Sequence, residues 1–318
     1  MNKLFEDLRT GDRGALGKAI TLIESTRPQD RGAAKALLAR CANYSGKAYR
    51  LGVTGIPGVG KSTLIDALGT ELIQRTHKVA VLAIDPSSVT SGGSILGDKT
   101  RMEKLAQNDD AFIRPSATAG TLGGVARRTR ETITLCEAAG YDRILIETVG
   151  VGQNELEVDR MTDLNLLLMI AGAGDELQGI KRGIMEAADI VAITKTASQA
   201  IQRPQQAQRD LINAIHYLPL RTNGRHPEVL LTDAITNAGI TELTDHIEEL
   251  FTMGQGSGML DAKRSEQDLY WLQKAVEAGL LERFREDPKT RIAMENAVNA
   301  VHNGADPFSA AEDVLASI

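Results

Sequence analysis

Apolar residues follow a helical period in the first part of the chain. Leu4 and Leu8 lie four positions apart, and similar spacings continue through 16–23 and 33–41. Spacings of three and four residues are typical of amphipathic helices with one buried face. The segment carries helical periodicity only, so we predict an N-terminal helical region over residues 1–46.

The middle of the chain changes to short apolar runs separated by helical stretches. Each run is apolar at nearly every position, which is typical of strands that are buried on both faces. Strands that alternate with helices predict a mostly parallel sheet covered by helices on both faces, that is, an α/β domain over 47–255. Its ligand site should lie at the carboxyl ends of the strands. Seven runs are the predicted strands: 50–54, 79–84, 111–113, 143–146, 164–170, 190–193 and 229–231.

The last part of the chain returns to helical periodicity. A glycine-rich segment, 254–258, is expected to be flexible and to precede it. Beyond it, an apolar stripe recurs at helical spacing and must be buried against something. We therefore predict a C-terminal helical arm over 256–318. The stripe consists of Leu269, Trp271, Leu272, Val276, Leu280, Leu281 and Phe284.

The turn after the first predicted strand carries the most informative motif. Residues 55–62 read Gly-Ile-Pro-Gly-Val-Gly-Lys-Ser and match the phosphate-binding pattern GxxxxGK[ST] without a mismatch. Glycines let the main chain curl so that successive N–H groups face an anion, and a helix that starts near Lys61 adds its N-terminus. We expect Lys61 to reach the β and γ phosphates of a nucleoside triphosphate and Ser62 to hold Mg2+. The predicted nucleotide contacts in this loop are Gly55, Gly58, Val59, Gly60, Lys61, Ser62 and Thr63.

Composition excludes several other classes of function. The chain has 318 residues, 42% of them hydrophobic, which is enough for a sizeable core. Its two cysteines have no metal-binding spacing, and no window approaches about 20 apolar residues, so we expect a cytoplasmic protein that does not cross a membrane. A net charge of −6 with both signs intermixed argues against a nucleic-acid partner.

Acidic residues occur where two predicted strands end. Asp85 follows the run 79–84, and Glu147 follows 143–146. Carboxylates at neighbouring strand ends beside a phosphate loop suit Mg2+, directly or through its waters. Gly150 could then lend its N–H to a γ-phosphate that is present before hydrolysis and absent afterwards, and Gln153 could orient the attacking water.

Six segments together resemble a known family, the MeaB/ArgK-type P-loop GTPases that accompany methylmalonyl-CoA mutase. The resemblance covers nearly the whole chain and places it in the SIMIBI group of GTPases. The segments are Asp85–Ser88, Gly92–Met102, Ile113–Ser116, Gly120–Arg127, Glu147–Gln153 and Gly172–Lys181.

The resemblance implies a chaperone for a cobalamin-dependent acyl-CoA mutase, using GTP and GDP with Mg2+. It assigns phosphate and metal binding to positions matching Lys61, Ser62, Asp85, Asp98 and Glu147. It implies mobile switches at about 86–102, 149–160 and 172–182. The third switch, which contains Asp175, Gln178 and Lys181, would communicate with the mutase. Finally, it implies a homodimer joined mainly through the C-terminal arm.

One departure concerns the nucleobase. The family carries Asn-Lys-x-Asp after the sixth strand, and here the residues are Thr194, Lys195, Thr196 and Ala197. The missing Asp would accept two hydrogen bonds from guanine, and its loss could weaken guanine binding by on the order of a hundredfold or more. Lys195 can still lay its stem against a purine, and we expect Thr194, Lys195 and Thr196 to border the nucleotide. A later base-contacting pair, usually Ser-Ala, reads Asp233-Ala234.

Sequence alone leaves open the base specificity and two alternatives to the chaperone function. Another acidic residue could contact guanine, base specificity could be relaxed, or the purine preference could have changed, so ATP and ADP stay possible ligands. A P-loop kinase linked to amino-acid transport shares the phosphate loop but lacks a candidate base for an acceptor hydroxyl. The other alternative function is a nucleotide-sensing scaffold with little turnover.

Overall fold

The computed structural model describes residues 2–84, 101–115, 122–148, 155–171, 182–198, 202–221 and 224–317. The chain divides into two compact units, Met1–Arg264 and Ser265–Ile318. The three-part division predicted from the sequence stays a prediction. No helix in the described ranges is long and apolar enough to cross a bilayer.

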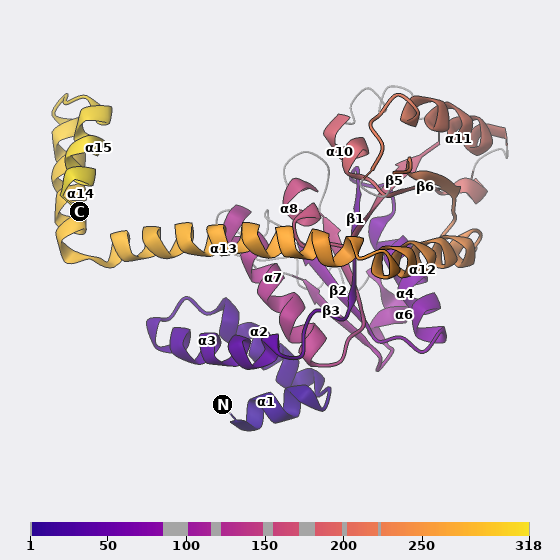
Figure 1. Cartoon of the computed structure of the whole chain (residues 1–318), viewed down its shortest axis with the longest axis horizontal. Helices are drawn as coiled ribbons and strands as arrows, with labels where there is room; N and C mark the ends of the chain where they lie inside the picture. Colours follow the sequence, from indigo (N-terminus) through magenta and orange to yellow (C-terminus); the bar gives the residue numbers. More distant parts are fainter. Residues whose placement is uncertain are drawn as a thin grey trace. The chain divides into compact units, whose positions relative to one another are not determined.

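Seven parallel strands form one sheet at the centre of the first unit, as the apolar runs predict (Figure 1). The order is β3-β2-β4-β1-β5-β6-β7, and every neighbouring pair is parallel. Parallel pairing brings the carboxyl ends of all strands to one edge. The strands are β1 (Tyr49–Gly55), β2 (Val79–Ile84), β3 (Ala111–Pro115), β4 (Arg143–Thr148), β5 (Leu164–Ile170), β6 (Ile190–Thr194) and β7 (Glu228–Leu231).

Helices cover both faces of this sheet. Strand β5 shows the division, since Leu166 and Leu168 join a core cluster with α4 and α12, whereas Leu167 and Met169 join another with α10 and α11. Alternate side chains of a strand point to opposite faces, so both faces are apolar. The helices between or after strands are α4 (Lys61–Gln74), α6 (Glu103–Ala106), α7 (Leu122–Ala138), α8 (Glu155–Asp159), α10 (Arg182–Ala187), α11 (Gln202–Ile215) and α12 (Ile240–Gly256), with a short turn η2 (Thr196–Ser198).

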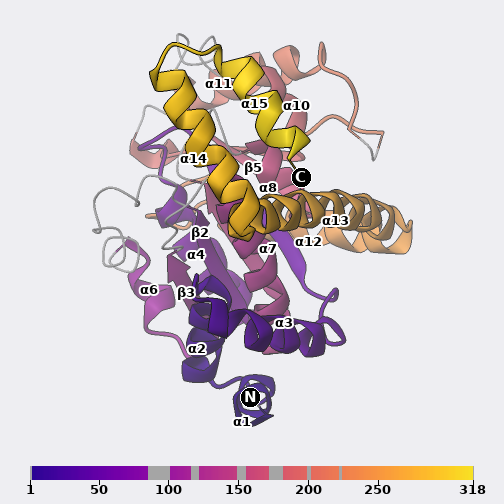
Figure 2. The same cartoon turned by 90° about the vertical axis from the view of Figure 1, so that its left-hand side faces the viewer.

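Three helices precede the sheet: two of them, α2 and α3, pack on α7, which itself contacts β2, while α1 packs on α2 and donates one hydrogen bond from Arg9 to the carbonyl of Ala138 (Figure 2). They are α1 (Asn2–Arg9), α2 (Arg13–Glu24) and α3 (Pro28–Ala42), as the helical period predicts. Asp12 caps α2 by accepting a hydrogen bond from the N–H of Ala15 at 2.5 Å. Arg9 and Arg40 each stack on an aromatic ring, of Tyr44 and Phe5 respectively. At its other end, α2 reaches the sheet through Glu24, which accepts a hydrogen bond from Arg114 of β3 at 2.6 Å.

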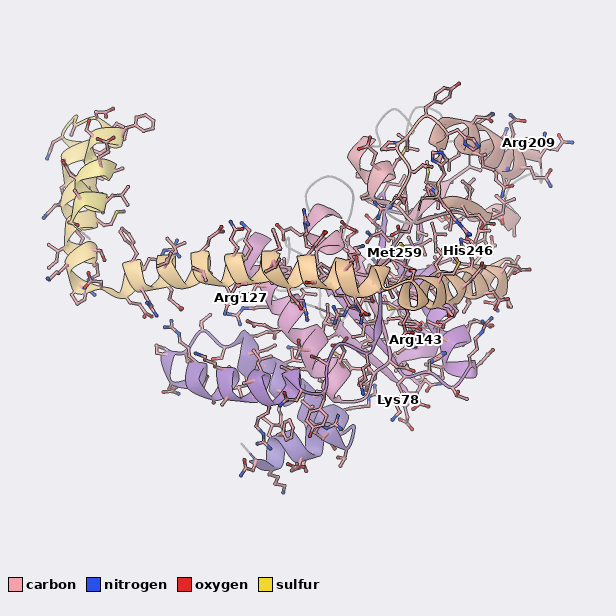
Figure 3. All side chains as sticks on the ribbon, in the orientation of Figure 1. Lys78, Arg127, Arg143, Arg209, His246 and Met259 are labelled. Carbon is pink, nitrogen blue, oxygen red and sulfur yellow. The ribbon has the colours of Figure 1, made fainter. Side chains whose placement is uncertain are left out.

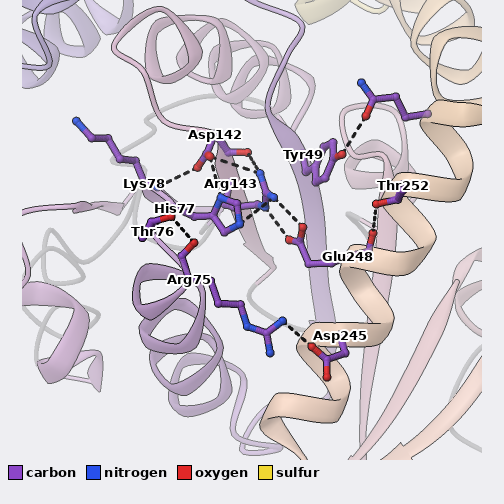
Figure 4. A network of polar contacts seen from close by, with 11 residues as sticks. Tyr49, Arg75, Thr76, His77, Lys78, Asp142, Arg143, Asp245, Glu248 and Thr252 are labelled. Carbon is purple, nitrogen blue, oxygen red and sulfur yellow. Dashed lines mark hydrogen bonds and ion pairs between the residues drawn. The ribbon is translucent and has the colours of Figure 1, made fainter.

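A polar network joins α12 to the amino-terminal edge of the sheet (Figure 4). Arg143 donates to both carboxylate oxygens of Glu248 at 2.7 Å and lies over the ring of Tyr49. It also lies 3.1 Å from Nε2 of His77, whose Nδ1 is 2.9 Å from Asp142. A guanidinium only donates, so Nε2 of His77 accepts. Figure 3 labels Arg143 and Lys78 at this edge, which is opposite the phosphate loop.

The glycine-rich segment near 254 is more helical than expected. Helix α12 continues to Gly256, and α13 (Met259–Glu286) begins after a short turn. A Cβ on Gly254 would lie 2.9 Å from Cγ of Leu260, so close packing stabilises this glycine in the helix and overrides its low propensity. The expectation of a flexible segment across 254–256 is therefore wrong.

The first turn of α13 is anchored in the first unit. Leu260 is buried in the sheet's core, and Arg264 donates two hydrogen bonds to the buried carboxylate of Asp163, at 2.8 and 2.6 Å. The same guanidinium donates to the carbonyls of Gly46 and Ala48. The second unit begins directly afterwards and contains the rest of α13 with α14 (Pro288–His302) and α15 (Pro307–Ala316), which contact each other.

Candidate functional site

The glycine-rich loop connects the end of β1 to the start of α4 at the carboxyl edge of the sheet. Gly60 precedes the helix with φ of 102°, a conformation that favours glycine. A Cβ on Gly55 would lie 2.8 Å from the carbonyl oxygen of Leu168, so a larger residue there would push the loop off β5. The strand, loop and helix thus occur in the order that phosphate binding requires.

Lys61 lies inside this loop and is buried. Its Nζ donates to the carbonyl oxygens of Gly55 at 2.9 Å and Ile56 at 3.1 Å. Burial lowers the pKa of the Lys61 ammonium, and the nearby Glu147 carboxylate partly opposes this shift. The ammonium is therefore held at the centre of the loop, where the charge of a phosphate group would favour its protonated form.

Ser62 and Glu147 meet across the sheet edge. The Ser62 hydroxyl donates to Oε1 of Glu147 at 2.9 Å, although the two residues lie 85 positions apart. Glu147 belongs to the end of β4, which pairs with β1, and this pairing carries the carboxylate to the first turn of α4. A hydroxyl and a carboxylate side by side are the oxygen donors that Mg2+ prefers.

The segment 194–197 lies against the phosphate loop on its other side. The Thr194 hydroxyl donates to the carbonyl oxygen of Val59 at 2.8 Å and lies 3.2 Å from that of Met169. Lys195 has φ of 59°, and its Nζ donates to the carbonyl oxygen of Gly58 at 2.7 Å. Two consecutive side chains therefore tie this segment to the loop.

A second loop, residues 232–238, braces the same segment. Its Asp233 accepts a hydrogen bond at Oδ2 from the N–H of Ala197 at 3.0 Å. At Oδ1 it accepts from the N–H of Ile235, and from the N–H and hydroxyl of Thr236, at 3.0–3.1 Å. Burial alone would raise the pKa of the Asp233 carboxyl, but these hydrogen bonds hold that pKa below its ordinary value. The Thr196 hydroxyl adds a bond to the carbonyl of Thr232.

The structure brings together the predicted residues that it describes. Gly55, Gly58, Gly60, Lys61 and Ser62 form the loop, with Glu147, Thr194, Lys195 and Thr196 around it. The Val59 side chain is buried in the core, so only its main chain faces Thr194, and the Thr63 side chain is exposed. Seven further predicted residues lie outside the described ranges: Asp85, Asp98, Gly150, Gln153, Asp175, Gln178 and Lys181.

Two structural roles were not predicted from the sequence. The Thr194 hydroxyl makes the contact to the phosphate loop, and the Asp233 carboxylate braces the Ala197 turn. The pattern Asp233-Ala-Ile-Thr236 could have indicated the second role, because Asp side chains commonly accept hydrogen bonds from N–H groups two and three residues ahead. For Thr194 the sequence holds no equivalent signal.

Comparisons with known proteins agree with this geometry. A family model described as methylmalonyl-CoA mutase-associated GTPase MeaB matches residues 16–289. A Mycobacterium tuberculosis protein named a probable GTPase is 49% identical over 309 residues, covering 97% of this chain and 92% of that protein. The mouse mitochondrial methylmalonic aciduria type A homologue is 43% identical, covering 99% of this chain and 78% of the relative. A crystal structure titled LAO/AO transport system kinase superposes with a TM-score of 0.76 at 36% identity, covering 98% of this chain and 95% of that one.

Proposed function

The chain belongs to the family of methylmalonyl-CoA mutase-associated GTPases, a family of P-loop GTPases, and from this premise we propose that its GTP hydrolysis depends on Mg2+ and serves a cobalamin-dependent acyl-CoA mutase. One observation carries the catalytic part of the proposal. The Ser62 hydroxyl and the Glu147 carboxylate lie 2.9 Å apart beside Lys61, at the start of α4.

Each group has a distinct task in the proposed reaction. The N-terminus of α4 and the curled main chain of the loop bind the phosphates, and Lys61 adds a positive charge where the β and γ phosphates lie. Ser62 and Glu147 would hold Mg2+, together with Asp85 and Asp98, and Gln153 would orient the attacking water. A Mg2+ ion held by these residues would supply positive charge that offsets the negative charge developing on the transferred phosphate.

The proposed partners follow from the family. We propose that this chain is a chaperone for a mutase such as methylmalonyl-CoA mutase, and that residues 172–182, with Asp175, Gln178 and Lys181, face that partner. The family's association with the mutase supports this role. The proposal places the protein in the cytoplasm, where the mutase would also have to be.

We further propose a homodimer formed through the second unit. Leu269, Leu272, Val276 and Leu280 are each more than half exposed and share one side of α13. Their spacing forms one continuous apolar stripe, whose burial contributes roughly 25 cal/mol per Å2 before the costs of association. A second copy of the same arm offers the same stripe.

Phosphate release tests the proposed chemistry. Purified protein should release inorganic phosphate from GTP when Mg2+ is present, and excess chelator should stop the release. All of the γ-phosphate should be recovered as free inorganic phosphate, and none should be attached to a co-purified small molecule or protein. Transfer of labelled γ-phosphate to an acceptor would instead support the kinase alternative. Capture of an acyl-CoA mutase by the immobilised protein, dependent on the bound nucleotide, tests the chaperone role.

A truncation tests the proposed dimer. The deletion should begin at Ser265, because Leu260 and Arg264 stabilise the first unit. Light scattering should find a dimer for the full chain and a folded monomer for residues 1–264. A monomeric full-length protein would contradict the proposal.

A further inference from the structure

The base side of the nucleotide site lacks the group that usually selects guanine. Guanine presents two donors, N1–H and the 2-amino group, and position 197 is an alanine. Residues 195–209 contain no Asp or Glu at all, and residues 232–238 contain only Asp233. Asp233 is therefore the one nearby carboxylate in these two loops that could replace the missing contact.

The Asp233 carboxylate is already hydrogen-bonded to residues of these two loops. It accepts four hydrogen bonds, three at Oδ1 and one at Oδ2, and the residue is only 4% exposed. Turning it toward a base would remove the acceptor for the N–H groups of Ala197, Ile235 and Thr236. Leaving such groups unpaired is unfavourable. Because the residue is buried in this arrangement, a guanine contact would require the Asp233 side chain to turn out of it.

Two side chains at this junction, those of Lys195 and Ile235, offer apolar surface. Lys195 is tied to the phosphate loop through Gly58, so its aliphatic stem runs beside the place where a nucleotide continues from its phosphates to its base. Ile235 is 82% exposed, and the Asp233 brace fixes its main chain. An exposed isoleucine and a lysine stem both offer surfaces on which a purine ring of either kind can lie.

We propose that this base subsite holds a purine by its faces and accepts adenine as well as guanine nucleotides, because Ala197 offers guanine no carboxylate and Asp233 is held in its own loop. This inference rests on the proposed function, since it concerns the same nucleotide site. It also specifies what restoring guanine selectivity requires. Ala197→Asp alone would place a second carboxylate beside Asp233, whose Oδ2 lies 3.0 Å from the N–H of Ala197. Like charges so close oppose ionisation.

The inference also changes which substitutions should be combined. Restoring the family motif Asn-Lys-x-Asp in full would require Thr194→Asn together with Ala197→Asp. The structure shows that Thr194 already bonds to Val59, so position 194 needs no change. The position that must change together with 197 is 233, where a serine removes the competing charge.

Calorimetric titration with Mg2+-GDP and Mg2+-ADP tests the proposal on four proteins: wild type, Asp233→Ser, Ala197→Asp and the double variant. We expect wild type to bind both nucleotides within about tenfold of each other. The double variant should raise the preference for GDP by on the order of a hundredfold, and Ala197→Asp alone by much less. Ala197→Asn is the matched neutral control and should change the ratio little.

Two results would contradict these proposals. A wild-type preference for GDP of about a thousandfold that falls in Asp233→Ser would show that Asp233 contacts guanine, and the inference would be wrong. Asp233→Asn, which keeps an acceptor oxygen for the loop, separates this outcome from simple unfolding, as does the circular dichroism spectrum of each variant. Failure of the wild type to bind either nucleotide would instead overturn the proposed function itself.

Discussion

The phosphate side and the base side of this site are built from different kinds of contact. The phosphate side uses main-chain groups of residues 55–60 with Lys61 and Ser62, and it retains the full motif. The proposed base side depends on side chains: Ala197 stands where the family pattern has an aspartate, and Thr194 and Asp233 hold the segment in place. Main-chain recognition is insensitive to most substitutions, so base selectivity can change while phosphate binding is kept.

Loss of the loop lysine should have the largest effect. Lys61→Ala should lower GTP and ATP hydrolysis equally, by about 100-fold or more, because an oriented charge at the reacting phosphate is removed. Lys78→Ala, an exposed lysine at the opposite edge of the sheet, is the matched control and should hydrolyse normally. Steady-state phosphate release on folded proteins measures both. Normal turnover in folded Lys61→Ala would break the phosphate-side assignment.

Substitution of the proposed metal ligands should have the second-largest effect. Glu147→Gln and Ser62→Ala should each lower Mg2+-dependent hydrolysis by roughly tenfold to 100-fold, because an amide or a methyl is a poor ligand for Mg2+. Diphosphate binding without Mg2+ should change little, since the loop N–H groups remain. The same expectation holds for Asp85→Asn and Asp98→Asn. Variants that keep a normal Mg2+ dependence would show that the metal lies elsewhere.

Loss of the hydrogen bond from Thr194 to Val59 should have a smaller effect, equal for the two nucleotides. Thr194→Val removes the hydroxyl bond to Val59 and should weaken GDP and ADP alike, by about fivefold to tenfold, as expected for loss of one hydrogen bond. Thr196→Val, which loses a bond to Thr232 instead, is the control and should weaken them less. Calorimetry would measure all four affinities. A loss confined to GDP would mean that Thr194 takes part in choosing the base.

Acid should weaken the Asp233 brace, with the smallest effect. The folded-state pKa of Asp233 lies below its unfolded value of about 4, so its contribution is present above that pH and is lost as the pH falls through the lower folded value. The stability difference between wild type and Asp233→Asn should therefore shrink below about pH 4. Thermal unfolding from pH 7 to pH 3 measures it, with exposed Asp109→Asn as the control. A difference that stays constant would refute the brace.

Much of the fold could be predicted because its strands are continuous apolar runs. All seven runs are strands, the sheet is parallel, and the phosphate loop lies at its carboxyl edge. The strand order cannot be read from such runs, because strands that are apolar on both faces fit several neighbours. The close approach of Ser62 and Glu147 depends on that order, although each residue was predicted separately.

The base side could be predicted only as a departure from a family pattern. Sequence identified Ala197 and Asp233 as unusual, but whether Asp233 faces a base or its own main chain depends on local geometry. The expectation of a flexible segment over 254–258 was wrong across 254–256 for a related reason. Packing of Leu260 on Gly254, a tertiary contact, outweighs the local preference of glycine.

Hydrolysis of GTP and ATP by one preparation tests the central claim most directly. The account predicts Mg2+-dependent phosphate release from both nucleotides, with values of kcat/KM within about tenfold, and loss of both activities in Lys61→Ala. Similar values for GTP and ATP follow from an unselective base side, and loss of both activities in the variant follows from a shared phosphate side. Turnover of GTP with ATP hydrolysed a thousandfold less efficiently would contradict it.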